Sequence, residues 1–311
     1  MELRQLEILR ELGALGSVTA VAAALHVTPS AVSQQLSALQ REFQAPLTQR
    51  RGRNLSLTNA GLALSRAGVD VIDAIAAARH AVEVFEAVPS GTVRLCGFHS
   101  AAQALFGPVI TELRTLEDAP KLHLADEDVA QEGFPQLAAR YDLVLAHRLA
   151  HSAPWPSDDL QVIPLVQEPL DVALPIGHPL ARRAELAPAD VAGERWVTSR
   201  EGFSPDDLVG AIAAVTDRSI EVVHRVNDYG SVASVIASGD AIGMVPRYTV
   251  GSAHAGLVLR PLTGITASRR IDLLTRPENL HRQSVQTVIA ALRFVMARLV
   301  EATELPPPRP E

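Results

Sequence analysis

The stretch TPSAVSQQLSAL at residues 28–39 combines small hydroxyl and amide side chains with one regular row of apolar residues. Thr28 is suited to cap a helix, and Pro29 fits its first turn, where the missing N–H costs nothing. Apolar residues then recur at the spacing of one helical face, which predicts a stripe buried against a core. The predicted stripe consists of Val32, Leu36, Leu39 and Phe43.

The opposite face of this predicted helix carries groups that form hydrogen bonds. Amides and hydroxyls on a narrow helix can read base edges in the major groove of DNA. Gln34 can contact adenine N6 and N7 together, a contact worth about 1–3 kcal/mol. The alternative is that these side chains only solvate a surface. The hydrogen-bonding face consists of Ser30, Ser33, Gln34, Ser37 and Arg41.

Two helices are predicted before this segment and two short strands after it. Regularly spaced leucines predict a helix at 2–14, and Ser17 is a suitable cap for the second. LTQR at 47–50 and NLSLT at 54–58 predict strands joined through Gly52. Three helices and a basic wing are typical of a winged helix-turn-helix, whose wing can follow phosphates. The predicted DNA contacts are Thr28, Pro29, Ser30, Ser33, Gln34, Ser37, Arg50, Arg51 and Arg53.

The charge of the 311-residue chain is unevenly distributed. Residues 1–60 hold six Arg and four Glu and so carry +2, which leaves −9 for the remainder of a chain of net charge −7. A small basic segment on an acidic body favours a DNA-binding module fused to a part that does not touch DNA. No signal peptide and no apolar run long enough for a membrane helix is evident, so the sequence predicts a cytoplasmic location and no membrane partner.

A helix of about 30 residues is predicted from Thr58 to Val88, where the sequence contains no proline. Its apolar residues follow a 4-3 alternation, which predicts a seam for a second helix, and VPSG at 88–91 marks a linker. Pairing between subunits is one interpretation, and packing on the helix's own domain is the other. The predicted seam consists of Leu64, Gly68, Val71, Ile75, Ala78, Val82 and Phe85, widened by Val69 and Ile72.

Beyond residue 91, predicted strands and helices alternate, which favours an α/β domain with a mostly parallel sheet covered on both faces. PPPRPE at the end predicts a disordered tail over 304–311. The predicted strands are 92–98, 121–125, 141–146, 160–176, 195–199, 219–226, 241–245 and 268–275. The predicted helices are 101–117, 130–139, 205–216, 229–238 and 281–303.

With these elements placed, the chain resembles a LysR-type transcriptional regulator from Met1 to about residue 303. The most specific resemblance lies in MELRQLEILRELGALGSVTAVAAALHVTPSAVSQQLSALQREF and in LSLTNAGLAL at the junction of wing and linker. Weaker matches are VRLCGFHSAAQALFGPVI, YDLVLAHR, LPIGHPLA and IASGDAIGMVPR. The chain departs from much of the family where it reads Pro29-Ser30 in place of Gln-Pro, Gln34 in place of Arg, and Thr48 in place of an aromatic residue or Leu.

The resemblance implies an N-terminal all-α winged helix-turn-helix over 1–58 and a linker and dimerisation helix over 59–90. It further implies a two-lobed α/β effector domain over 91–303, similar to a periplasmic binding protein. Lobe I would comprise 91–163 and 270–303, lobe II would comprise 165–267, and a hinge would lie near 163–166 and 267–270. The implied partners are a roughly palindromic operator, a small-molecule effector, further copies of the chain in a dimer or tetramer, and RNA polymerase as an additional candidate.

An effector is expected between the lobes, where strand ends and helix starts meet. Ser100 and Ser199 follow the family pattern best, and Arg200 is a candidate partner for a carboxylate. The alternative is that these residues are ordinary caps and loop residues. The predicted effector contacts are His99, Ser100, Gln103, His147, Thr198, Ser199, Arg200, Phe203, Asn227, Asp228, Tyr229 and Met244.

Catalysis, a cofactor and a metal are not predicted. His147 and His151 are four residues apart but leave a strand for a Pro-rich loop, and Cys96 lies in an apolar strand and is expected in the core. The sequence contains no motif of an activated nucleophile or a phosphate-binding loop. Two other functions remain open, a regulator that acts without ligand and, with less support, a solute-binding protein or transferase.

Overall fold

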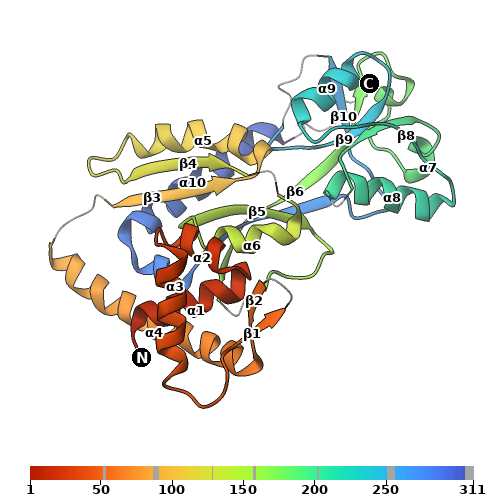
Figure 1. The fold of residues 1–311 in the computed structure, drawn as a ribbon. Helices are drawn as coiled ribbons and strands as arrows, with labels where there is room; N and C mark the ends of the chain where they lie inside the picture. Colours follow the sequence, from red (N-terminus) through yellow and green to blue (C-terminus); the bar gives the residue numbers. More distant parts are fainter. Residues whose placement is uncertain are drawn as a thin grey trace.

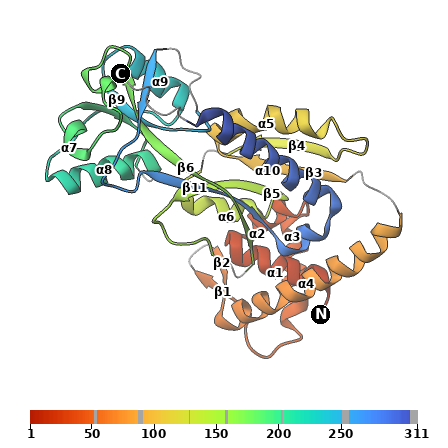
Figure 2. The same ribbon diagram turned by 180° about the vertical axis from the view of Figure 1, so that it is seen from behind.

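The structure is a computed structural model, and it describes residues 1–51, 54–86, 91–127, 129–156, 159–201, 203–250 and 256–304. An N-terminal head and one long helix lie against the first lobe of an elongated α/β body, and the second lobe lies beyond it (Figures 1 and 2). Among the described residues, no helix has the length and apolar character needed to cross a lipid bilayer. The predicted tail lies outside the described residues apart from Glu304.

The head contains three helices and a two-stranded wing. They are α1 (Leu3–Leu15), α2 (Val18–Ala24), α3 (Pro29–Gln40), β1 (Thr48–Arg51) and β2 (Asn54–Leu57), the last two antiparallel. Ser17 accepts from the Ala20 N–H and Thr28 from the Ala31 N–H, so both predicted caps are confirmed. Val32, Leu36 and Leu39 are buried in the core of the head, as predicted. The prediction for Phe43 is wrong, because α3 ends at Gln40 and the ring, now off the helical register, is 37 % exposed.

The long helix is α4 (Asn59–Glu86), as the sequence predicts. It packs along α1, where Gly68 lies so close to Leu6 that a Cβ would be 3.3 Å from a side-chain atom. Gly68, Val69 and Ile72 are buried, whereas Val71 and Val82 are 40 % and 57 % exposed. The predicted seam is therefore split between packing within the same chain, on α1 and η4 (Pro277–His281), and solvent. The Phe85 side chain lies outside the described part. The exposed half remains available to another helix.

Lobe I is built on the first strands of the body. Its elements are β3 (Thr92–Gly97), α5 (His99–Leu113), β4 (Lys121–Asp126), η1 (Gln131–Gly133), α6 (Phe134–Leu137), β5 (Leu143–Leu149), β11 (Ser268–Thr275), η4 (Pro277–His281) and α10 (Gln283–Thr303). The two long helices α5 and α10 pack side by side (Figures 1 and 2). Cys96 is fully buried in the lobe I core, as expected from its apolar strand.

Lobe II has a separate core around the fully buried Trp196. Its elements are η2 (Pro179–Arg182), α7 (Pro188–Val191), β7 (Arg195–Thr198), α8 (Ser204–Thr216), β8 (Glu221–Arg225), α9 (Tyr229–Ala237), β9 (Ile242–Pro246) and β10 (Leu257–Arg260). The strand β10 has no counterpart among the predicted strands, and it pairs with the lobe II half of β6 (Gln161–Pro175).

One nine-stranded sheet runs through both lobes in the order β4-β3-β5-β11-β6-β9-β7-β8, with β10 added beside β6. The strands β3, β4 and β5 are parallel, and so are β7, β8 and β9, but β11 and β6 run antiparallel to their neighbours. The prediction of a mostly parallel sheet is therefore wrong, because β6 and β11 return across the molecule and join the lobes. The β6–β11 register shifts between Ile271 and Asp272, opposite the hinge expected at 163–166.

Candidate functional site

The predicted polar face of α3 points to solvent. Ser30, Ser33, Gln34 and Ser37 are exposed, and so are Thr28 and Pro29 at the start of the helix. A wide, shallow groove runs along this face, and its lining adds residues that the predicted contacts did not include. The lining consists of Ser30, Ser33, Gln34, Gln35, Ser37, Ala38 and Arg41.

Two hydroxyls on this face, those of Ser33 and Ser37, already donate their protons within the helix. Ser33 Oγ donates to the Pro29 carbonyl at 3.0 Å, and Ser37 Oγ donates to the Ser33 carbonyl at 2.8 Å. Their outward lone pairs can accept, which suits the amino groups of adenine and cytosine in a major groove. Gln34 makes no hydrogen bond to any described residue and keeps both its donor and its acceptor for a partner.

Of the three arginines predicted in the wing, the structure describes the side chain of one. Arg50 is exposed on β1, opposite Leu55 of β2. The backbone of Arg51 ends β1, but its side chain and all of Arg53 lie outside the described part of the chain. Only Arg50 can therefore be placed, and its guanidinium is free to reach a phosphate beside the groove of α3.

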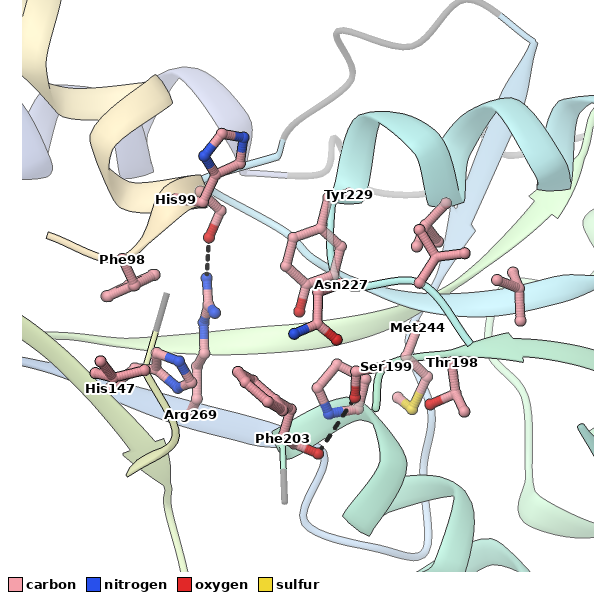
Figure 3. A pocket seen from close by; sticks show the side chains of 16 residues that line it. Phe98, His99, His147, Thr198, Ser199, Phe203, Asn227, Tyr229, Met244 and Arg269 are labelled. Atoms are coloured by element: carbon pink, nitrogen blue, oxygen red, sulfur yellow. Dashed lines mark hydrogen bonds between the residues drawn. The ribbon is translucent and has the colours of Figure 1, made fainter. Parts of the chain in front are cut away.

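A cavity of about 50 Å³ lies between the two lobes. Nine of the predicted effector contacts line it, namely His99, Ser100, His147, Thr198, Ser199, Phe203, Asn227, Tyr229 and Met244 (Figure 3). Gln103 and Arg200 do not. Gln103 contacts the His99 ring from the next turn of α5 at 3.0 Å, and exposed Arg200 lies over the Phe203 ring at 5.5 Å.

Arg269 is the polar residue of the cavity that the sequence analysis missed. It is 2 % exposed and lies with its guanidinium 4.9 Å from the centre of the Phe98 ring. Arg269 and Arg270 are adjacent at the start of a predicted strand. Because successive side chains of a strand point to opposite faces of the sheet, one of the two must point into the protein. The sequence does not indicate which one. The apolar lining residues also missed are Phe98, Val129, Val197, Pro205, Val226 and Val232.

The Arg269 guanidinium belongs to a buried hydrogen-bond network. Its Nε donates to Glu168 at 2.8 Å, and its Nη2 donates to Thr249 at 2.8 Å and to Ser100 at 3.1 Å. Figure 3 shows Arg269 among the residues of the cavity wall. The other Glu168 oxygen accepts the backbone N–H groups of Tyr248 and Thr249. The charges cancel, and the described hydrogen bonds leave Nη1 of Arg269 unused beside the cavity.

Three other polar atoms of the cavity lining are buried without a partner among the described residues. They are Thr198 Oγ1, Asn227 Nδ2 and His147 Nδ1. Buried polar atoms in native proteins are almost always paired, and an unpaired one costs about 1–3 kcal/mol. Three such atoms around one cavity indicate a place where a ligand or ordered water completes the hydrogen bonding.

Two ionisable groups of the lining, His147 and Tyr229, are held in their neutral forms. Burial first, and the nearby Arg269 charge second, lower the pKa of His147 well below its ordinary value. Burial likewise raises the pKa of Tyr229 to about 12. With Arg269 and Glu168 compensating each other, the cavity wall carries no net charge at neutral pH.

His99 joins the two lobes at the rim. Its Nδ1 lies 3.4 Å from Asp126 of lobe I, and its Nε2 lies 3.2 Å from Asp228 of lobe II. Asp228, a predicted contact, also caps α9 by accepting from Ser231, and these hydrogen bonds lower its pKa. Its role in the structure is therefore at the rim and not in the cavity wall.

The described residues form no candidate metal site. They contain no group of three or more His, Cys, Asp or Glu side chains placed to hold a metal ion. Cys96 is fully buried, and burial raises the pKa of its thiol, which makes it a poor nucleophile.

The fold and the two sites define a class of protein, a winged helix-turn-helix head joined to a two-lobed binding domain. Two family descriptions match the chain, a bacterial regulatory helix-turn-helix of the LysR family over residues 3–62 and a LysR substrate binding domain over residues 86–297. The chain therefore belongs to the LysR family and is a DNA-binding transcriptional regulator with a substrate-binding domain.

Individual relatives are distant but similar along their whole length. The transcriptional dual regulator GltC of Bacillus subtilis is 25 % identical over 280 residues, 90 % of this chain and 92 % of that protein. A full-length OxyR variant from Pseudomonas aeruginosa superposes with a TM-score of 0.66 at 16 % identity, covering 94 % of this chain and 98 % of that one. CbnR in complex with its target DNA superposes with a TM-score of 0.52 at 18 % identity, covering 95 % and 100 %.

Proposed function

We propose that this regulator responds to a small molecule bound between its lobes and reads DNA with the polar face of α3. The observation that carries the effector proposal is the set of buried, unpaired polar atoms around the interlobe cavity. A regulator that ignored ligands would have no reason to leave Thr198 and Asn227 unsatisfied there. The predicted contacts that line the cavity are the effector contacts proposed here.

The effector is a small molecule that is uncharged or singly charged. The cavity holds a ligand of only a few non-hydrogen atoms unless the lobes part. Its wall carries no net charge, so a multiply charged ligand would lose its hydration without compensation. Asn227 Nδ2 and the free Nη1 of Arg269 need an acceptor, and Phe98, Phe203 and Met244 supply apolar contact.

On DNA, Gln34 specifies bases and the basic wing positions the head. Thr28 and Pro29 start the helix at which a phosphate can be bound, and Ser30, Ser33 and Ser37 offer acceptors along the groove. Arg50, with Arg51 and Arg53 as further candidates, neutralises phosphates. The exposed half of α4 supports a dimer of two such heads on a roughly palindromic operator.

Several broader expectations belong to the same proposal. The chain divides functionally into 1–58, 59–90 and 91–303, and two dimers associate into a tetramer through their effector domains. The protein acts as a regulator and not as an enzyme, works in the cytoplasm where bacterial DNA lies, and has RNA polymerase as a further partner. The matching family descriptions and the similarity to transcriptional regulators support these expectations.

DNA reading is tested with gel shifts of an operator duplex, recovered by selection from random DNA, against random duplex. We expect Gln34→Ala to weaken operator binding by about 1–3 kcal/mol and to leave random binding almost unchanged. Gln161→Ala, an exposed glutamine at the start of β6, is the matched control. Equal losses on both duplexes would show that Gln34 does not read sequence.

Effector binding is tested by thermal shift against a panel of small neutral and monoanionic metabolites. A ligand that raises the melting temperature of the wild type should fail to do so with Thr198→Val. If no compound shifts the protein and operator binding is constitutive, the regulator acts without ligand. Saturable ligand binding without any operator binding would instead favour a solute-binding protein.

A further inference from the structure

The DNA-binding head is docked on lobe I of its own chain through a cluster of buried charges. Arg276, which follows β11, donates from Nη2 to the Glu11 carboxylate of α1 at 3.1 and 3.2 Å. Arg10 donates to Glu11 at 3.1 Å and lies 2.8 Å from Glu278 of η4. These four residues, called the joint below, lie between α1 and the end of β11.

The joint is buried as deeply as a protein core. Glu11 is 2 %, Arg276 3 % and Arg10 7 % exposed. Burial by itself disfavours the charged form of Arg10, but the carboxylates of Glu278 and Glu11 outweigh it and raise the Arg10 pKa. Charges in such a place are stable only opposite their partners, so the head is held in one orientation as long as it stays docked.

The joint is nevertheless incompletely bonded. Arg10 Nη1, Arg276 Nε and Glu278 Oε2 are buried without a partner among the described residues. A cavity of about 360 Å³ lies beside them, between α1 and α4 on one side and α6 with the loop before β6 on the other. A permanent interface would fill this space with apolar side chains, so the contact has the character of one that can open.

Two exposed or half-exposed contacts flank the joint. Asp73 of α4 lies 2.8 Å from His281 of η4, and His26 lies 3.4 Å from Arg94 of β3. Both are polar and accessible to water, so they add orientation and little strength. These two polar contacts can therefore open when the head leaves lobe I.

A single strand connects the joint to the interlobe cavity. Arg269, near the start of β11, lines the cavity, and Arg276 directly follows its end. The strand is paired on both sides, with β5 and β6, over almost its whole length. The strand runs about 23 Å from Arg269 to Arg276, with one register shift against β6 between Ile271 and Asp272, so a displacement at Arg269 can be passed along it to Arg276.

We propose that the joint is a releasable lock that fixes the head on its own lobe I, and that β11 links this lock to the interlobe cavity. Docking does not cover the reading face of α3, which stays exposed in the docked head. The lock instead sets where the head stands relative to the effector domain, and hence the separation of two heads in a dimer. The link to the cavity rests on the proposed effector, whereas the lock itself does not.

The test measures the distance between head and lobe I by paired spin labels in the ligand-free protein. Labels at Gln44→Cys in the head and Glu117→Cys after α5, in chains diluted with unlabelled protein, report the distance within one chain. Cys96 stays unlabelled because it is buried and its pKa is raised. We expect one narrow distance distribution with the joint intact and at least a twofold broader one in Glu11→Gln with Arg276→Gln.

Glu7→Gln is the matched control, because Glu7 forms a partly exposed ion pair with Arg4 on the same helix, away from the joint. A half-site duplex must bind the variants as tightly as the parent, which shows that the head is folded. Should the double variant fail this criterion, Glu278→Gln replaces it and is expected to broaden the distribution as well. A narrow distribution in a folded joint variant, or a broad one in the parent, would overturn the lock.

Discussion

Two buried charge clusters in this protein have the same chemistry and different surroundings. Around Arg269 and Glu168, hydroxyls and backbone amides complete the ion pair, and only one guanidinium nitrogen is left beside a cavity of about 50 Å³. At the joint, three polar atoms remain unpaired beside a cavity of about 360 Å³. The first cluster lies within the effector domain, and the second lies between two parts that can separate.

This difference decides what happens when a charge is removed. If Glu168 loses Arg269, its fully buried carboxylate stays held in the sheet by the backbone N–H groups of Tyr248 and Thr249. If Glu11 loses Arg276, the head can undock and the carboxylate returns to water. Burial alone therefore does not determine how much stability is lost when an ion pair is broken. The loss also depends on whether the remaining charge can be hydrated by a local opening of the structure.

The largest effect is expected for Arg269→Met. Removing one partner of a buried pair should lower the unfolding free energy of the effector domain by about 3–5 kcal/mol. Denaturant titration with tryptophan fluorescence measures it, because both tryptophans, Trp155 and Trp196, lie in that domain. Arg270→Met, at the exposed neighbouring position, should change the midpoint very little. Similar midpoints for the two variants would contradict the structural role of Arg269.

A pH effect of intermediate size is expected from His147. Its pKa in the folded protein lies well below about 6.5, the value for an unfolded chain, so between these values the unfolded state binds more protons. The unfolding free energy should therefore fall with decreasing pH, by up to about 1.4 kcal/mol per pH unit below about 6.5. His147→Asn should remove this slope and His151→Asn, on an exposed loop, should keep it. Persistence of the slope in His147→Asn would assign it to another group.

Arg276→Met compares the joint directly with the Arg269–Glu168 cluster, since Arg276 is as buried as Arg269. We expect a loss of only about 1 kcal/mol in the same fluorescence titration, because Glu11 regains water when the head undocks. The Asp159 carboxylate, the other partner of Arg276, is partly exposed and adds little. A loss as large as that of Arg269→Met would mean that the head cannot leave lobe I.

The smallest effect should have the opposite sign. Thr198→Val keeps the shape of the side chain and removes a buried hydroxyl that has no partner. We expect the ligand-free protein to become more stable by about 0.5–1 kcal/mol, measured as a higher denaturation midpoint. A clear destabilisation would show that the hydroxyl is satisfied in the ligand-free protein.

Much of the secondary structure could be predicted from the sequence because its signals are local. Ser17 and Thr28 cap their helices as predicted, and each predicted strand has a counterpart in the structure. Phe43 shows the limit of a periodic pattern, which does not indicate that a helix stops at Gln40. The four-residue β10 is too short to carry a pattern of its own, and its pairing with β6 defines it.

The cavity was predictable in outline, since residues that follow strands and start helices gather where two α/β lobes face each other. Nine predicted side chains meet there, whereas Gln103 points one helical turn away and Arg200 turns to solvent. Arg269 was not predicted as a cavity residue, because two adjacent arginines at the start of a strand resemble a solvated run of charges. Only the pairing of β11 with both β5 and β6 places one of them inside.

The sequence by itself determined the helix-turn-helix, its polar reading face and the long helix that follows, since caps and periodicity act between residues a few positions apart. The tertiary structure alone decided that Arg269 meets Glu168 and that Arg276 meets Glu11, 265 positions away along the chain. Ion pairs of this kind depend on which faces of separate elements pack together. Many weak packing contacts together determine which faces meet, and the spacing of residues in the sequence does not predict this outcome.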